Sequence, residues 1–206
     1  MANEVASLTK AEIQSLDLPN TLELYKVLYS RVVKFTSFVE EFAELTTSDR
    51  RFLLSANLEP VATIRMASCL DPKTPMAQLK ELGRLDVSFG FERIRISQIF
   101  KMPWAANEQH VDLYIKVIEG LVALPAFDAK SNLLLQLVAL FSTLGLDSKR
   151  LENPAKIERY QELFTEQLLK YLRARVGITK SNVVIHMYLS HLASLRTLSE
   201  MILSKN

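Results

Sequence analysis

The sequence is poor in cysteine, in glycine and in long apolar runs. Its 206 residues include one cysteine, Cys69, and five glycines. A single cysteine excludes a disulfide or a cysteine-pair zinc site within these residues, and it favours a reducing compartment. The longest apolar run, 133–141, is interrupted by Gln136 and is too short to span a bilayer. Because the first residues are polar and lack the apolar core of a signal peptide, we expect a cytosolic or nuclear protein without membrane contact.

The sequence also lacks an excess of charge of one sign and the motifs of common enzymes. Charged residues make up 23% of the chain, and the formal net charge of +2 is too small to predict a nucleic-acid surface. It has no Gly-rich phosphate loop, no H-E-x-x-H and no nucleophile elbow. Glu40 and Glu41 are adjacent carboxylates, but neighbours on a helix do not face each other. We therefore expect neither an enzyme nor a metal site.

Leucine is abundant, and apolar residues recur at helical spacing through most of the chain. One such stripe runs from Leu22 to Val39 and predicts a long helix that begins near residue 20. Thr46 and Asp49 are spaced to cap a second helix, from about residue 48 to residue 67. Pro60 lies inside this second segment and should bend it.

The second half of the chain predicts four further helices. A stripe over 111–122, ended by a proline, predicts the first, and residues 129–143 are apolar on most sides, as in a helix buried inside a bundle. Asn153, followed by proline, should begin a helix that Gly177 ends. A last helix should run from about residue 180 to residue 204.

One region departs from helical spacing. Val87, Phe89 and Phe91 alternate with other residues, and Ile94 and Ile96 continue the alternation. This period of two predicts a short strand pair or an extended turn. Because no linker or repeat divides the chain, the residues predict one domain that is nearly all α-helical, with a small β element before its middle.

Residues 35–54, FTSFVEEFAELTTSDRRFLL, carry the spacing of a known family motif. They resemble the W/F-A-K-x4-F-x2-L-x3-D-Q-x2-L-L motif of nuclear hormone receptor ligand-binding domains. Phe42 and Asp49 stand at matching positions, whereas Ser37 and Arg50 stand where the family has lysine and glutamine.

Three later stretches resemble the same family in the same order. They are LEPVATIRMAS (58–68), the segment from LVALF to KYL (137–172), and LASLRTLSEMI (192–202). The likeness covers about residues 20–203. It implies an all-α fold, a three-layer antiparallel helical sandwich with a small β-turn or hairpin, formed by residues 1–206 as a single domain.

The resemblance implies a lipophilic ligand held between the long helix, the helix segment that contains Arg65, the β-turn and the last long helix. Arg65 matches an arginine that anchors a ligand oxygen in some relatives, although it could instead pair with a carboxylate or carbonyl groups in a filled core. An acidic ligand is not expected, because Cys69 replaces a second arginine. Haem is not expected either, since Ile202 stands where some relatives have the haem histidine. The matching positions are Tyr25, Leu28, Tyr29, Val32, Ala62, Arg65, Met66 and Cys69.

The resemblance also implies a groove for coregulator peptides. In the family, a lysine and a glutamate from a final helix hold the two ends of an L-x-x-L-L helix. Ser37 replaces the lysine, Arg51 takes a position that is usually apolar, and the sequence ends at SEMILSKN, before such a final helix. We expect either a domain cut before that helix or a receptor that naturally lacks it and represses constitutively. The groove positions are Val33, Ser37, Arg50, Arg51 and Leu54.

The last helix matches the family's dimer interface. Leu192 and Leu195 are expected to point inward, with Tyr188 and His191 nearer the partner. Arg196 is expected in a surface salt bridge or a partner contact. The interface positions are Val184, Met187, Tyr188, His191, Leu195 and Arg196.

Taken with the resemblance, the sequence predicts the ligand-binding and dimerisation domain of an orphan, repressive nuclear receptor that acts in the nucleus. Its partners would be a second copy or another nuclear receptor, and coregulator peptides, corepressors in particular. DNA would be bound only through a zinc-finger domain outside this chain. The alternative is a ligand-free helical adaptor or dimerisation module with a filled core.

Overall fold

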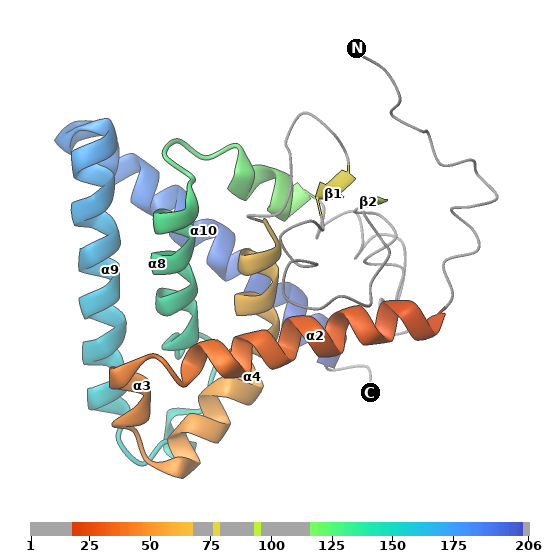
Figure 1. Ribbon diagram of the computed structural model, residues 1–206. Coiled ribbons are helices and arrows are strands. Elements are labelled where there is room, and N and C mark those ends of the chain that lie inside the picture. The colour runs from red at the N-terminus through yellow and green to blue at the C-terminus, as the bar shows by residue number, and fades with distance from the viewer. Residues whose placement is uncertain (1–17, 68–75, 79–92, 96–115, 204–206) are drawn as a thin grey trace.

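The computed structural model describes residues 18–67, 76–78, 93–95 and 116–203 of the chain. Besides the labelled elements of Figure 1, the structure describes a helical segment at 116–122. These elements are α2 (Leu18–Thr36), α3 (Glu40–Ala43), α4 (Thr47–Ala67), β1 (Met76–Gln78), β2 (Arg93–Arg95), α8 (Ala129–Leu140), the 3-10 turn η1 (Ser148–Arg150), α9 (Pro154–Val176) and α10 (Ile178–Leu203).

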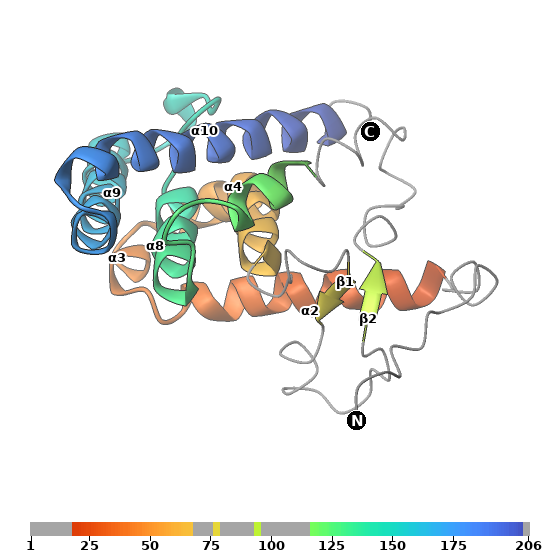
Figure 2. The ribbon, with the colours of Figure 1, turned by 90° about the horizontal axis from the view of Figure 1, so that it is seen from above.

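The described helices form three layers, which Figures 1 and 2 show from two directions. α2 crosses one side of the molecule, α4 and α8 lie in the middle, and α10 covers the opposite side. α8 packs against both α4 and α9, and α10 packs against α9 and α4. The expected all-α, three-layer architecture is confirmed.

Local capping signals place most helix ends where the sequence predicts them. α4 runs Thr47–Ala67, and the Thr46 hydroxyl accepts the Asp49 backbone N–H at 3.2 Å. The Asn153 side chain accepts the Lys156 N–H at 3.1 Å at the start of α9. Gly177, with a φ of 85°, joins α9 to α10 in a backbone conformation that favours glycine.

Two sequence expectations need correction. The apolar stripe to Val39 is longer than its helix, because α2 ends at Thr36 and Val39 precedes α3. β2 lies inside the region of alternating residues, but its antiparallel partner is β1, with Ala77 opposite Ile94. The positions Val87, Phe89, Phe91 and Ile96 lie outside the described residues.

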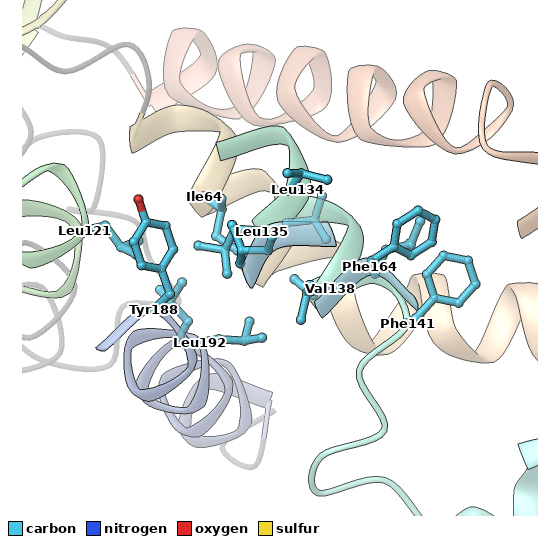
Figure 3. Packing of buried hydrophobic residues seen from close by; sticks show 14 of the residues in the cluster. Ile64, Leu121, Leu134, Leu135, Val138, Phe141, Phe164, Tyr188 and Leu192 are labelled. Carbon is cyan, nitrogen blue, oxygen red and sulfur yellow. The ribbon is translucent and has the colours of Figure 1, made fainter. Parts of the chain in front are cut away.

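The core is centred on α8, whose apolar side chains face both neighbouring layers (Figure 3). Phe141, which follows the helix, stacks on Phe164 with ring centroids 5.4 Å apart and meets the edge of Phe42 at 6.0 Å. Burying each such side chain stabilises the fold by roughly 1.5–3 kcal/mol. α8 is therefore enclosed on most sides, as its sequence predicts.

The first N–H groups and the last carbonyl groups of a helix have no partners within it, and side chains can supply them. At the start of α8, Asp128 accepts the N–H groups of Lys130 and Ser131, each at 3.0 Å, and the Ser131 hydroxyl accepts the Asp128 N–H at 2.8 Å. At its end, the Asn57 amide donates to the carbonyls of Leu140 and Ser142 at 3.1 and 2.9 Å. Both ends of the central helix are thus capped by side chains.

A second buried amide ties α8 to α4. Asn132 donates to the Ile64 carbonyl at 2.6 Å, in the last turns of α4. The Gln136 amide donates in turn to Asn132 Oδ1 at 2.5 Å. The bond from Asn132 to Ile64 fixes the register of the two helices, because a shift of either one would leave a buried polar group without a partner.

The aspartate of the family motif has a structural role. Asp49 is fully buried, and its two carboxylate oxygens accept the backbone N–H groups of Glu152 at 2.8 Å and Asn153 at 3.1 Å. Because Asn153 begins α9, the negative charge also lies at the positive end of that helix. One side chain therefore joins the start of α4 to the start of α9.

We predict that Asp49→Ala lowers the free energy of unfolding by about 3 kcal/mol, since two buried N–H groups lose a charged acceptor. Asp147→Ala is the matched control, because Asp147 is exposed and accepts one N–H, from Lys149 at 3.1 Å. The control should cost about 0.5–1 kcal/mol. Urea denaturation monitored by circular dichroism measures both, and equal losses would contradict the assigned role.

Asp128 should make stability sensitive to acid. Partial burial acts to raise the pKa of its carboxyl, but the hydrogen bonds from Tyr171, Ser131 and Lys130, with the Arg175 charge, outweigh burial and hold the pKa below its ordinary value. A lowered pKa gives stability that is present above the unfolded-state pKa of about 3.9 and is lost as the pH falls through the folded-state value.

We therefore predict that acidification from neutral pH to below pH 4 destabilises the wild type more than Asp128→Asn. Urea midpoints across that pH range measure the difference, with the exposed Asp147→Asn as control. Parallel pH profiles for the wild type and Asp128→Asn would show that this carboxylate is not the group that titrates.

Candidate functional site

The described positions expected to line a ligand pocket come from α2 and α4, which pack together. α2 carries Leu28, Tyr29 and Val32, and α4 carries Ala62, Arg65 and Met66. The Tyr25 side chain and Cys69 lie outside the described residues. The fold thus places the described part of the expected set at one junction between layers.

Four of these side chains are enclosed by protein. Leu28, Val32, Ala62 and Met66 each expose at most 5% of their surface. A side chain that lines an open cavity keeps surface that a water molecule can touch, so these four pack against neighbours. Tyr29 and Arg65 are half-buried and retain some accessible surface.

A polar cluster at the same junction includes one residue that the sequence reasoning did not single out, Glu59. Burial raises the pKa of the Tyr29 phenol, and the negative charge of Glu59 raises it further. The Ser199 hydroxyl of α10 donates to Glu59 Oε2 at 3.5 Å. The phenol therefore stays protonated and can donate a hydrogen bond. The sequence signal for Glu59 is its position directly before Pro60, where a carboxylate stands in a segment otherwise rich in apolar residues.

Arg196 is a core residue, and the expectation of a surface salt bridge or partner contact is wrong. Only 9% of it is exposed. Its guanidinium Nη1 donates to the Ala56 carbonyl at 2.6 Å and to Asn57 Oδ1 at 3.1 Å. The side chain therefore joins α10 to the middle of α4.

Pro60 explains why the Ala56 carbonyl needs that partner. Proline has no backbone N–H, so the carbonyl four residues earlier in a helix loses its usual donor. Arg196 supplies the donor from another layer and also orients Asn57, whose amide caps α8. The N–H that Pro60 lacks and the buried guanidinium of Arg196 are thus two parts of one arrangement.

The positions expected to bind a coregulator lie at the exposed end of α2 and the exposed start of α4. Val33 is 47% exposed, and Phe38, in the turn after α2, is 75% exposed. Arg51 is exposed and Leu54 is half-buried. We call Val33, Ser37, Phe38, Arg51 and Leu54 the α2–α4 face.

Two polar members of the expected groove already have partners within the chain. The Ser37 hydroxyl donates to the Lys34 carbonyl at 2.7 Å, in the last turn of α2. Arg50 Nη2 donates to Thr47 Oγ1 at 3.2 Å. Ser37 thus serves the end of its own helix, and no lysine ammonium stands at its position.

Most residues expected at a dimer interface are instead buried in the chain. Val184, Tyr188 and Arg196 are buried, and so are Leu192 and Leu195, which were expected to point inward. Tyr188 was expected near a partner, but its hydroxyl donates to Ser131 Oγ at 3.3 Å, and burial raises its pKa to about 12 although the Ser131 hydrogen bond opposes the shift. Spacing alone misplaced Tyr188 because apolar residues occupy more than one side of α10.

The exposed row of α10 contains other side chains. Val183 and Met187, one turn apart, are both exposed. His191 is half-buried and lies against the 116–122 helix, since a Cβ on Gly120 would come within 2.4 Å of its Cε1. Burial lowers the pKa of the His191 imidazole, which favours the neutral form. A partner could therefore reach Val183 and Met187 but not Tyr188.

Two searches of the described residues bear on function. No group of three or more His, Cys, Asp or Glu side chains is arranged to hold a metal ion in the parts of the chain that the structure describes. None of the described helices combines the length and apolarity needed to cross a membrane.

We predict energetic coupling between Pro60 and Arg196. Arg196→Met should lower the free energy of unfolding by about 3 kcal/mol, because two buried acceptors lose their donor. Pro60→Ala restores an N–H opposite the Ala56 carbonyl, so the double variant should lose about 1 kcal/mol less than the sum of the single variants. Urea denaturation of all four proteins measures the coupling.

The exposed Arg173→Met, on α9, is the control and should change stability by no more than about 0.5 kcal/mol. Strict additivity of Pro60→Ala and Arg196→Met would show that the freed carbonyl does not depend on the guanidinium.

Comparison with known proteins identifies the fold. No protein-family description and no curated protein matches the sequence. Solved structures do match, and one of them is the crystal structure of constitutive androstane receptor, with a TM-score of 0.71 and 16% sequence identity. The match covers 93% of this chain and 74% of that one. At this identity the likeness concerns the fold alone: the chain is folded as a nuclear receptor ligand-binding domain.

Proposed function

We propose that the chain is the ligand-binding and dimerisation domain of a nuclear receptor that regulates transcription in the nucleus through coregulator peptides and a receptor partner, a second copy or another nuclear receptor. The observation that carries the proposal is the α2–α4 face, which exposes Phe38 and Val33 within this fold. Exposed large apolar side chains that lie together are typical of a docking surface. DNA contact would belong to a domain outside these residues.

Repression is the mode that the α2–α4 face favours. An activating coregulator helix is gripped at its C-terminal carbonyls by a lysine at the position of Ser37, according to the family resemblance. Here the Ser37 hydroxyl is engaged with the Lys34 carbonyl and carries no charge to complement a helix dipole. A partner must therefore bind chiefly through apolar contacts and through other charges of the face.

The packing of α2 and α4 favours a second candidate function, a ligand-free helical adaptor or dimerisation module. Leu28, Val32, Ala62 and Met66 are enclosed by neighbouring side chains, which leaves them no contact surface for a ligand. The half-buried Tyr29 and Arg65 are the described positions where a lipophilic ligand with a polar group would bind.

Peptide binding tests the coregulator proposal. We expect purified protein to bind corepressor-type amphipathic peptides in fluorescence anisotropy and to bind L-x-x-L-L peptides weakly. Phe38→Ser should weaken corepressor binding at least about tenfold, because a buried Phe contributes roughly 1.5–3 kcal/mol. Leu163→Ser, at an exposed position on α9, should leave binding unchanged. Tight ligand-free binding of L-x-x-L-L peptides would contradict the repressive part.

Native mass spectrometry separates the two candidate functions and reports oligomeric state. We expect a dimer, with Val183→Glu and Met187→Glu giving monomers and Leu163→Glu leaving the dimer intact. A dimer mass equal to that of the polypeptides alone would favour the ligand-free module. A copurified lipid would contradict the filled core. Such a ligand should also raise stability, by about 2.7 kcal/mol at a hundredfold excess over Kd.

A further inference from the structure

We infer that the α2–α4 face selects a partner helix that places a carboxylate opposite Arg51. The inference rests on the proposed coregulator function of this face and names the chemistry of its partner, an amphipathic helix of another protein with an acidic side chain beside its apolar row. It follows from Arg51, Lys34 and the apolar side chains around them.

Among the described residues, Arg51 differs from Arg50, Arg150 and Arg196 because its guanidinium has no partner. Arg50 bonds to Thr47, Arg150 lies over the Phe52 ring at 4.4 Å, and Arg196 is buried among carbonyls. Among the residues that the structure describes, Arg51 has no ion pair and no side-chain hydrogen bond. Its guanidinium is therefore available to a partner.

The position of Arg51 allows it to discriminate between acidic and neutral partner helices. It lies one turn before Leu54 on α4, so a helix that covers the apolar side chains of the face also removes water from the guanidinium. A charge that loses water without gaining a partner opposes binding, whereas a carboxylate can accept two parallel N–H bonds from the planar guanidinium. A neutral apolar helix is rejected by the same group that attracts an acidic one.

Lys34 extends the same preference along α2. It is exposed, lies next to Val33 and belongs to the last turn of the helix. Within the described residues, no carboxylate is in ion-pair contact with its ammonium group. The face thus has one exposed cation on each helix, Lys34 beside Val33 in the chain and Arg51 one turn before Leu54.

The partner helix needs an acidic residue at one position only, not along its whole length. Glu40 and Glu41 begin α3, two and three residues after Phe38, so acidic side chains follow the Phe38 part of the face along the chain. A uniformly acidic peptide would be repelled there. The partner should carry its carboxylate at the end that covers Arg51 and neutral or basic residues at the end that covers Phe38.

A charge-swap experiment tests the inference on the whole chain. The probes are fluorescein-labelled amphipathic peptides with identical apolar residues and Glu, Gln or Lys placed in turn at each flanking position. We expect the wild type to bind the best Glu peptide about tenfold more tightly than its Gln counterpart. Arg51→Glu should reverse the preference and favour the Lys peptide at the same position. The advantage of Glu should shrink as salt increases.

Arg173→Glu, a charge reversal at an exposed site on α9, is the control and should leave the preference of the wild type intact. Equal affinities for Glu and Gln peptides, or an unchanged order in Arg51→Glu, would overturn the inference while leaving the coregulator function in place. Absence of binding by every peptide to folded protein would overturn both.

Discussion

The fold depends on the capping of α8 by side chains from its surroundings. The first N–H groups and the last carbonyl groups of a helix have no partners within it, so side chains supply them where water does not. Asp128 meets this need at the start of the helix and Asn57 at its end. Because Asn57 belongs to α4 and is held by Arg196 from α10, the caps of the central helix also join the layers. Apolar packing gives the stability, and these polar bonds fix which helices pack together.

The chain also shows why local sequence signals predicted helix ends well and tertiary partners poorly. Thr46, Asn153 and Gly177 act within a few residues of themselves, so their spacing was enough to place α4, α9 and α10. Pro60 has no N–H to donate to the Ala56 carbonyl, and the sequence alone shows that this carbonyl needs another donor. Its partner, Arg196, lies 140 residues away, and nothing in the spacing of either residue connects them.

The last helix illustrates a different limit. α10 carries apolar residues on more than one side, since Val183, Val184 and Ile185 are consecutive. Periodicity therefore does not show which side of such a helix meets the core. The structure buries Val184 and exposes Val183, so a partner surface assigned from spacing alone mixed core residues with accessible ones. The described positions expected to bind a ligand lie on α2 and α4, which pack together, but the closeness of packing around Leu28 and Met66 was not readable from residue type.

Two arginines show how burial divides structural charges from functional ones. Arg196 is almost enclosed, and removing it would leave carbonyl and amide oxygens without a donor, so its charge belongs to the fold. Arg51 contacts no described partner and stands beside exposed apolar side chains, so the fold gains little from its charge. A cation kept next to an apolar docking surface weakens nonspecific association with neutral helices. Under the proposed coregulator function, this charge discriminates among partners only when one of them brings a carboxylate, which differs from a grip on the dipole of the partner helix.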